Sequence, residues 1–250
     1  MNPVSNMNQE KTLLLTGASR GIGHATVKKF ADEGWRVISC SRHPFPEDCP
    51  WPGGKDDHIQ VDLSAPSKII EAVQKIKTLL NGGPLHALVN NAGISPKAVD
   101  GGRLNTLDTE LSVWGQVFHV NFFASIVLAR GLKEELSMGK GAVVNVTSIA
   151  GSRVHPFAGA AYATSKAALA ALTREMAHDF GPLGVRVNAI APGEIETSIL
   201  SEGTDIIAQA LPLQRLGQPS EVASVIFFLC SESSSYVSGT EIQVNGAQHV

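Results

Sequence analysis

A tyrosine and a lysine that could transfer protons stand four positions apart, at Tyr162 and Lys166. The stretch around them has a helical pattern, and residues at this spacing share one face of a helix. A tyrosine hydroxyl, with an ordinary pKa of about 10, is a poor base at neutral pH, but a neighbouring ammonium favours the phenolate and lowers that pKa. The pair could therefore act as a tuned acid and base. On its own the pair is far more typical of an exposed pair on a helix surface.

A serine that follows a buried strand is a second candidate. Ser148 lies just after the apolar run AVVNV at residues 142–146. The carboxyl ends of the strands in an open α/β sheet are where ligands bind. The serine hydroxyl could hydrogen-bond a substrate oxygen there, and its alternative role is to form a turn.

The first predicted strand, residues 11–16, runs into a glycine-rich turn that holds Gly17, Gly21 and Gly23. Glycines allow a tight turn and a close approach to a pyrophosphate, and the N-terminus of the next helix attracts that anion. The spacing is GxxxGxG and not the GxGxxG of the usual dinucleotide fingerprint. An ordinary strand-to-helix turn is the alternative, but the position between the first strand and the first helix favours a dinucleotide.

The second predicted strand ends in Ser41 and Arg42, roughly 20 residues past the glycines, where an acidic residue would bind the ribose 2′-hydroxyl of NAD. A hydroxyl and a guanidinium suit a 2′-phosphate instead. Arg20, inside the glycine-rich turn, could add a second positive contact. We therefore expect NADP as cofactor, with NADPH preferred over NADH, and the alternative is that Arg42 is only a solvated charge.

The elements that must position these residues alternate between short apolar runs and longer helical patterns. The predicted strands are residues 11–16, 36–40, 58–61, 86–89, 142–146, 185–190 and 241–244, and the predicted helices include 21–33, 66–80, 107–135 and 159–180. Strands that are apolar on both faces suit a parallel sheet covered by helices on both sides. The rhythm predicts the α/β class, a doubly wound parallel sheet (Rossmann fold) with helices on both faces.

Size and composition limit the remaining classes. The 250 residues, of which 43% are hydrophobic, fit one domain over residues 11–250 behind a loosely ordered tail at 1–10. A net charge of -3 does not indicate a nucleic-acid partner. Three scattered cysteines and the lack of ligand spacing predict reduced thiols and no metal. The sequence shows no signal peptide and no apolar run near the ~20 residues of a membrane span, so we expect a cytoplasmic protein.

Several motifs then occur in a fixed order along the chain. They are TGASRGIG at residues 16–23, Asp62-Leu63, NNAG at 90–93, Asn121, Ser148, YATSK at 162–166 and PGEIET at 192–197. From residue 11 to 247 the chain resembles the short-chain dehydrogenase/reductase family. Its ending, residues 212–247, is similar to that of the 3-oxoacyl-[acyl-carrier-protein] reductase-like branch.

The resemblance implies roles for four catalytic residues. Tyr162 would be the general acid and base, and Lys166 would hold the nicotinamide ribose and lower the tyrosine pKa. Ser148 would position the reacting oxygen. Asn121 would hold a water in a proton relay to the lysine, and its alternative is a polar residue tolerated at a helix bend.

The resemblance also implies the cofactor contacts. Asp62 would bind the adenine amino group with Leu63 beside the ring, although an Asp here could instead cap the next helix. The expected contacts are Gly17, Ser19, Arg20, Gly21, Ile22, Gly23, Ser41, Arg42, Asp62, Leu63, Asn90, Ala92, Gly93, Tyr162, Lys166, Pro192, Gly193, Ile195 and Thr197. The last four of these would grip the nicotinamide carboxamide.

The substrate pocket is expected at residues 95–105, 149–157 and 194–213, with the last segment as a lid. Its apolar residues Ile149, Val154, Phe157, Ile199 and Leu200 suggest a partly apolar small-molecule carbonyl or alcohol, and His155 could touch it. A 3-oxoacyl thioester on an acidic carrier is one candidate. Lys133 and Lys140 could receive the carrier, whereas Leu183 offers no charge.

Three alternatives remain open from the sequence. The chain could be an NAD-dependent alcohol, sugar or polyol dehydrogenase, or a non-catalytic nucleotide-binding scaffold. A sugar-nucleotide epimerase of the extended branch would need a larger C-terminal substrate region than this sequence has. The resemblance further implies a homotetramer or homodimer that pairs the helices predicted at 107–135 and 159–180.

Overall fold

The computed structural model describes residues 10–45, 54–197 and 208–250. Residues 1–9 of the tail predicted at 1–10, the loop at 46–53 and the centre of the predicted lid, 198–207, lie outside the described residues. A seven-stranded sheet forms the core, with all its neighbours parallel and in the order β3-β2-β1-β4-β5-β6-β7. Its strands are β1 (Thr12–Thr16), β2 (Arg36–Ser41), β3 (His58–Gln60), β4 (Ala87–Asn90), β5 (Ala142–Val146), β6 (Arg186–Pro192) and β7 (Glu241–Val244).

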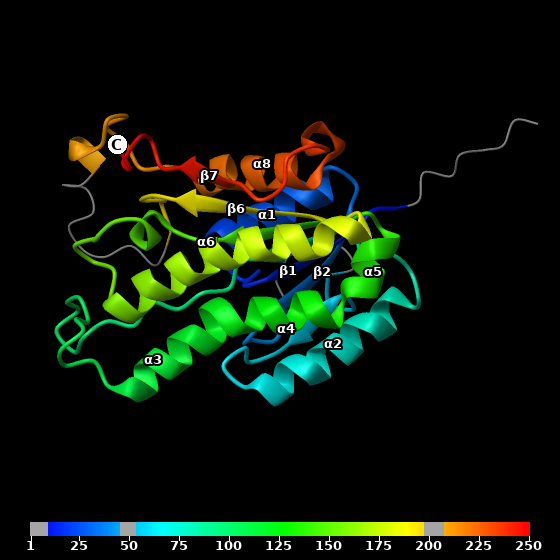
Figure 1. Ribbon diagram of the computed structural model, residues 1–250, viewed down its shortest axis with the longest axis horizontal. Coiled ribbons are helices and arrows are strands. Elements are labelled where there is room, and N and C mark those ends of the chain that lie inside the picture. Colours follow the sequence, from blue (N-terminus) through cyan, green and yellow to red (C-terminus); the bar gives the residue numbers. More distant parts are fainter. Residues whose placement is uncertain (1–9, 46–53, 198–207) are drawn as a thin grey trace, which may run out of the picture.

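Helices cover both faces of the sheet (Figure 1). They are α1 (Gly21–Asp32), α2 (Pro66–Leu80), α3 (Leu111–Phe118), α4 (Ala124–Gly131), α5 (Lys133–Met138), α6 (Ala160–Phe180) and α8 (Pro219–Cys230). Helices α1 and α8 pack on one face, and α2, α4 and α6 pack on the other. The predicted single doubly wound domain is confirmed.

The first strand shows why the sequence folds this way. Leu14 belongs to the core under α2, α4 and α6, whereas Leu13 and Leu15 belong to the core under α1 and α8. All three are fully buried. Successive side chains of a strand point to opposite faces, so a run of three leucines requires apolar cover on both sides.

The long helix predicted at 107–135 is shorter and interrupted. It starts at Leu111, because the Asn105 side chain accepts hydrogen bonds from the Leu107 and Asp108 amides and holds these residues in a turn. A π-helical turn, His119–Phe123, joins α3 to α4. The helix then ends at Gly131, and the chain resumes as α5.

The same helix corrects one expectation from the sequence. The segment Leu111–Gly131 has 21 residues and is long and apolar enough, by length and composition alone, to cross a membrane, with a mean hydropathy of 1.4 over its most apolar 18-residue window. The core helix of a globular fold passes the same test, and here the segment packs against α2 and α6. Only 28% of its apolar window is buried in the single chain.

Candidate active site

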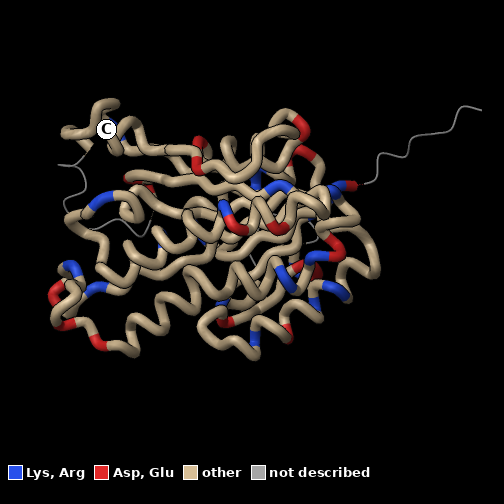
Figure 2. The backbone as a smooth tube through the Cα atoms, viewed as in Figure 1, with Lys and Arg blue, Asp and Glu red and all other residues tan. Residues whose placement is uncertain are grey.

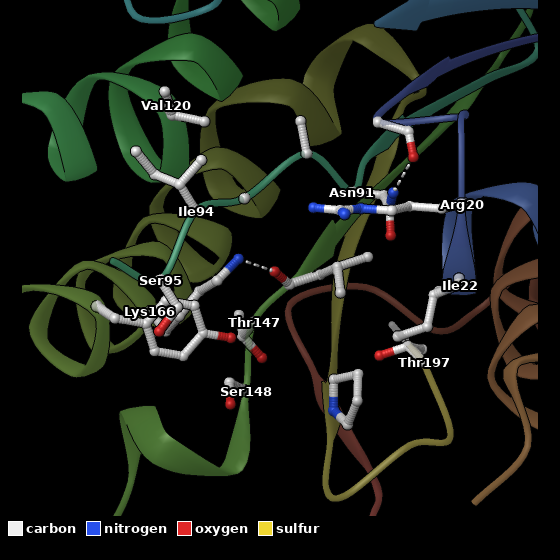
Figure 3. Close-up of a pocket in the computed structure, with 18 of the residues that line it drawn as sticks. Arg20, Ile22, Asn91, Ile94, Ser95, Val120, Thr147, Ser148, Lys166 and Thr197 are labelled. Carbon is white, nitrogen blue, oxygen red and sulfur yellow. Dashed lines mark hydrogen bonds between the residues drawn. The ribbon is translucent and has the colours of Figure 1, made fainter. Parts of the chain in front are cut away.

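A cleft of about 450 Å³ lies along the carboxyl edge of the sheet. Its walls come from the segments that follow β1, β2, β4, β5 and β6. Because parallel strands end at the same edge, residues far apart in the sequence meet there. Figure 3 shows Ser148 and Lys166 toward one end of this cleft and Arg20 and Ile22 toward the other.

The glycine-rich turn after β1 forms a tight backbone cradle. Gly17 and Gly21 have φ angles of 73° and 55°, which side-chain-bearing residues rarely adopt. A Cβ on Gly23 would lie 2.0 Å from the Gly17 carbonyl oxygen. Arg20 is the N-cap of α1, and its side chain makes no capping hydrogen bond. No capping side chain therefore occupies the first amides of α1, whose residues line the cleft. This geometry fits a pyrophosphate at a helix N-terminus.

Asn91 supports this cradle and was not predicted as a site residue. Its Nδ2 donates to the carbonyl oxygens of Thr16 and Gly17, at 3.0 Å each. The Thr16 hydroxyl in turn accepts from the Asn91 and Ala92 amides. The motif NNAG places two asparagines side by side, and only the alternation of β4 tells which one faces the cleft.

Asn90, the other asparagine, is buried in the sheet and is not on the wall of the cleft. Its Nδ2 donates to Oδ1 of Asn145 on β5 at 2.8 Å, and Asn145 donates to Thr173 on α6. This chain of bonds ties β4, β5 and α6 together. Asn90 was expected among the cofactor contacts, and the structure instead places its side chain between the strands of the sheet.

The end of β2 brings Ser41 and Arg42 to the cleft wall, and the end of β3 brings Asp62. The Ser41 hydroxyl donates to the His43 carbonyl at 2.8 Å. Asp62 accepts from the amide and the hydroxyl of Ser64, and these bonds, with a smaller contribution from Arg42, lower the pKa of its carboxyl. Asp62 does not cap α2, whose N-cap is Ala65.

Lys166 is buried beneath the catalytic end of the cleft, with 3% of its surface exposed. Its Nζ donates to the Val146 carbonyl at 2.6 Å, a bond drawn in Figure 3. Burial lowers the pKa of its ammonium to about 8. The ammonium lies 5.7 Å from the centre of the Tyr162 ring.

Tyr162 faces the cleft from the first turns of α6 and is hydrogen-bonded by Ser148. Burial raises the pKa of its hydroxyl above the ordinary value, the bond from Ser148 lowers it, and the charge of Glu194 raises it further. The net shift is upward, opposite to the lowering expected from Lys166. Burial is the largest of these effects.

Ser148 begins the 3-10 turn η2 (Ile149–Gly151) directly after β5. Its Oγ accepts from the Ala150 amide at 3.2 Å. The same hydroxyl also hydrogen-bonds Tyr162. Ser148 can therefore form the turn and still take the catalytic role predicted for it.

Asn121 lies in the π-helical turn and is 2% exposed. Its side chain accepts from the Ile94 amide at 2.8 Å and donates to the Ile94 carbonyl and to Ser165. A Cβ on Gly93 would lie 3.4 Å from Lys166 Nζ and 3.5 Å from Asn121 Oδ1, so the two side chains flank Gly93. Asn121 thus ties the loop after β4 to α6, and the water relay stays a prediction.

The end of the cleft that holds Ser148 also carries charged side chains, which the sequence did not indicate as a group. Lys97, His155 and Glu194 all line it, and of these only His155 was considered. Ile149 and Phe157 also line it, whereas Val154 is 81% exposed and lies off the wall. The predicted contacts Ile199 and Leu200 lie outside the described residues.

Apart from Asn90 and Asn121, every predicted catalytic or cofactor residue lies on the wall of this one cleft. The glycine cradle fits a dinucleotide pyrophosphate. The same cleft is lined by Pro192, Gly193, Ile195 and Thr197, and Thr197 lies beside Gly21 of the cradle. Within the described residues, no group of three or more His, Cys, Asp or Glu side chains could hold a metal ion.

Comparison with known proteins agrees with this geometry. The family model described as enoyl-(acyl carrier protein) reductase matches residues 17–249. The chain is 59% identical to Protein FixR of Bradyrhizobium diazoefficiens over 244 residues, which cover 97% of this chain and 88% of that protein. It is 35% identical over 253 residues to the 3-oxoacyl-[acyl-carrier-protein] reductase FabG of Aquifex aeolicus, covering 95% of this chain and 97% of FabG.

A solved structure gives the same result. An oxidoreductase from Brucella ovis, in complex with a partially ordered NAD, is 62% identical, with a TM-score of 0.83 and coverage of 95% of this chain and 100% of that one. A parallel sheet with a glycine cradle at its carboxyl edge, and a serine, a tyrosine and a lysine in the same cleft, define a nucleotide-dependent oxidoreductase. The chain belongs to the short-chain dehydrogenase/reductase family.

Proposed function

We propose that this chain is an NADP(H)-dependent oxidoreductase that interconverts a ketone and a secondary alcohol, with Tyr162 as the proton-transfer residue. One observation carries the proposal: Ser148, Tyr162 and Lys166 share a cleft with a glycine cradle that fits a dinucleotide. The nicotinamide supplies or accepts the hydride when it is bound. The residues of this chain orient the substrate and move the proton.

The raised pKa of Tyr162 keeps its proton in place at neutral pH, so the hydroxyl can donate to the alkoxide that develops as a ketone is reduced. Ser148, already bonded to the same hydroxyl, stabilises the substrate oxygen. As the tyrosine loses its proton, the Lys166 ammonium near its ring stabilises the phenolate. The reverse sequence serves alcohol oxidation.

Arg20 and Arg42 on the cleft wall support NADP(H) over NAD(H), because guanidinium groups bind phosphate with two donors each. The Brucella ovis relative is described with NAD, partially ordered. The two cofactors therefore need direct comparison in this chain, and equal efficiencies with NADPH and NADH would remove the role given to Ser41 and Arg42.

A 3-oxoacyl thioester is the second candidate substrate, supported by the similarity to FabG. The lysines suggested for carrier binding do not favour it. Lys133 begins α5 and Lys140 precedes β5, so both lie at the amino edge of the sheet, opposite the edge that holds Ser148. Five strand residues separate the two edges, a distance of roughly 15 Å.

A homotetramer or homodimer is proposed from the apolar helix pair α3–α4. Leu111 and Phe123 are 84% and 45% exposed, and residues 111–129 carry no Lys, Arg, Asp or Glu, which Figure 2 shows as an uninterrupted tan stretch. Elsewhere in Figure 2, basic and acidic residues are interspersed along the backbone. A second copy would cover this apolar surface. Sedimentation at micromolar concentration should give a multiple of the 26.4 kDa monomer mass, and a monomer would contradict the proposal.

The direct test is a panel of ketones and β-ketoacyl thioesters with NADPH and NADH, followed by the nicotinamide absorbance. We expect turnover of at least one ketone with NADPH favoured. Tight cofactor binding without any turnover would favour the non-catalytic nucleotide-binding scaffold instead.

A further inference from the structure

Three ionisable side chains surround the substrate end of the cleft. Lys97 comes from the loop after β4, His155 from the loop after η2, and Glu194 from the loop after β6. All three line the same cleft as Ser148 and Tyr162. The charge of Glu194 is close enough to the Tyr162 hydroxyl to raise its pKa. These side chains therefore face the position of the reacting carbonyl.

The hydrogen bonds of His155 fix its form. Its Nδ1 accepts from the Phe157 amide at 3.3 Å, so this nitrogen carries no proton. Its Nε2 lies 2.7 Å from Glu194 Oε1 and donates to it. The imidazole is then neutral, and the carboxylate holds the negative charge. The two side chains are only 11% and 12% exposed.

Two hydrogen bonds, one from the amide and one to the carbonyl, hold the backbone of Glu194 in place. Its amide donates to Gln248 Oε1 at 3.3 Å, and its carbonyl accepts from the Gly217 amide at 2.9 Å. The loop after β6 is thus tied to the C-terminal segment and to Gly217 without the help of the carboxylate. A role in holding the loop does not by itself account for a charged side chain inside the cleft, where burying it costs free energy.

Lys97 supplies the opposite charge. Its Nζ donates to the Phe157 carbonyl at 2.5 Å, which uses one of its three N–H groups. Burial lowers the pKa of this ammonium and the charge of Glu194 raises it, so the two groups sense each other. The cleft wall therefore offers both a strong acceptor and a strong donor within one small region.

We infer that Lys97, His155 and Glu194 form a subsite for hydroxyl groups next to the reacting carbonyl, so that the substrate is a polyhydroxylated ketone or its polyol. This inference rests on the proposed function and adds the substrate class to it. A hydroxyl both donates and accepts, so it can donate to Glu194 and accept from Lys97.

Other substrate chemistries fit this wall less well. A substrate carboxylate would meet the negative charge of Glu194, and like charges at close range repel. An acyl chain would offer no hydrogen bond to the remaining acceptor positions of the Glu194 carboxylate or to the remaining N–H groups of Lys97. Leaving such buried groups unpaired is a strong basis for rejecting an analogue that lacks a hydroxyl. The wall is therefore selective for neutral, hydroxylated molecules.

The test compares cyclohexanone with 2-hydroxycyclohexanone, two ketones that differ by one hydroxyl, in the wild type with NADPH. We expect kcat/KM to favour the hydroxylated ketone by about tenfold or more, mainly through KM. Glu194→Gln should reduce this preference to less than about threefold. Lys97→Met should weaken the preference in the same direction.

Glu196→Gln is the matched control, because Glu196 lies two residues away, is exposed and bonds Gln218 outside the cleft. It should keep the full hydroxyl preference. A thermal melt of each variant shows whether it is folded. A merely structural role of Glu194 would lower stability and the activity on both ketones together, and this result would overturn the subsite.

A binding measurement separates this inference from the proposed function. Calorimetric titration of the NADP⁺-loaded protein with myo-inositol should show binding that Glu194→Gln weakens at least about tenfold and Glu196→Gln leaves unchanged. If this holds but no ketone is reduced, the proposed function fails and the subsite stands. If both ketones are reduced equally well and myo-inositol does not bind, the subsite is wrong and the proposed function stands.

Discussion

The two ends of the cleft are built in different ways. At the cofactor end, Gly17, Gly21 and Gly23 leave room for a ligand by having no side chain, and backbone amides face it. At the substrate end, Lys97 and Glu194 project charged groups from loops. Backbone geometry determines what the cofactor end can bind, and the identity of the side chains determines what the substrate end can bind. Proteins of one family can therefore share the cofactor end while their substrates differ.

The largest effect expected from this comparison is at the cofactor cradle. In Gly23→Ala the new Cβ would meet the Gly17 carbonyl oxygen at 2.0 Å and Asn91 Nδ2 at 2.6 Å, so the backbone must move. We expect cofactor affinity to fall about 100-fold or more, measured by NADPH fluorescence, with a loss of about 1–3 kcal/mol in the free energy of unfolding.

Gly181→Ala is the control for that substitution. Gly181 follows α6, its φ is not positive, and a Cβ there would meet nothing within 4 Å. This variant should bind NADPH like the wild type. Wild-type cofactor affinity in Gly23→Ala would show that backbone geometry does not specify the cofactor end.

The buried lysine between the two ends gives the next prediction. Lys166→Met should lower turnover by about 10²-fold or more, because it removes the cation beside Tyr162. It should also change how stability depends on pH. The folded pKa of Lys166, about 8, lies below the ordinary 10.5, so the unfolded chain holds a proton that the folded chain has lost between these values.

This lysine therefore makes the free energy of unfolding rise with pH between about 8 and 10.5. Below pH 8 the full cost of burying its ammonium, on the order of 3 kcal/mol, lowers the stability of the folded chain. Urea titrations at several pH values give the free energy of unfolding of the wild type and of Lys166→Met. Over this pH range the wild type should gain stability relative to the variant. The lost bond to Val146 adds a term that does not vary with pH. A difference that is constant from pH 7 to 11 would show that the folded lysine titrates normally.

The smallest of these effects sharpens the cofactor assignment. Arg42→Ala should lower kcat/KM for NADPH by about tenfold, since it removes one charge-assisted contact to a phosphate, and should leave NADH nearly unchanged. Arg130→Ala, an exposed arginine on α4 away from the cleft, is the control. Equal losses with both cofactors would mean that Arg42 does not distinguish them.

The sequence predicted the cofactor end well, because its signals are local. All seven strands were placed within about two residues from their apolar runs, and parallel topology then put Gly17, Ser41 and Ser148 at one edge. The substrate end was predicted only as three segments. Lys97 and Glu194 are 97 residues apart in the chain, and no spacing rule joins a loop after β4 to a loop after β6.

Two further differences have the same cause. At the end of β4, Asn90 bonds the neighbouring strand and Asn91 bonds the glycine-rich turn. The motif alone does not show which of the two asparagines faces the cleft. The upward shift in the pKa of Tyr162 depends on burial and on Glu194, whereas the spacing to Lys166 suggested a downward shift. Tertiary surroundings decide both points.

The central claim is that Tyr162 transfers the proton, and one measurement tests it most directly. Reduction of a ketone by NADPH is followed at the nicotinamide absorbance for the wild type and for Tyr162→Phe, with NADPH affinity measured in parallel. The account predicts that the variant folds, binds NADPH like the wild type and loses turnover by about 10²–10⁴-fold, because only the phenolic hydroxyl is removed. Turnover within a few-fold of the wild type at unchanged NADPH affinity would contradict it.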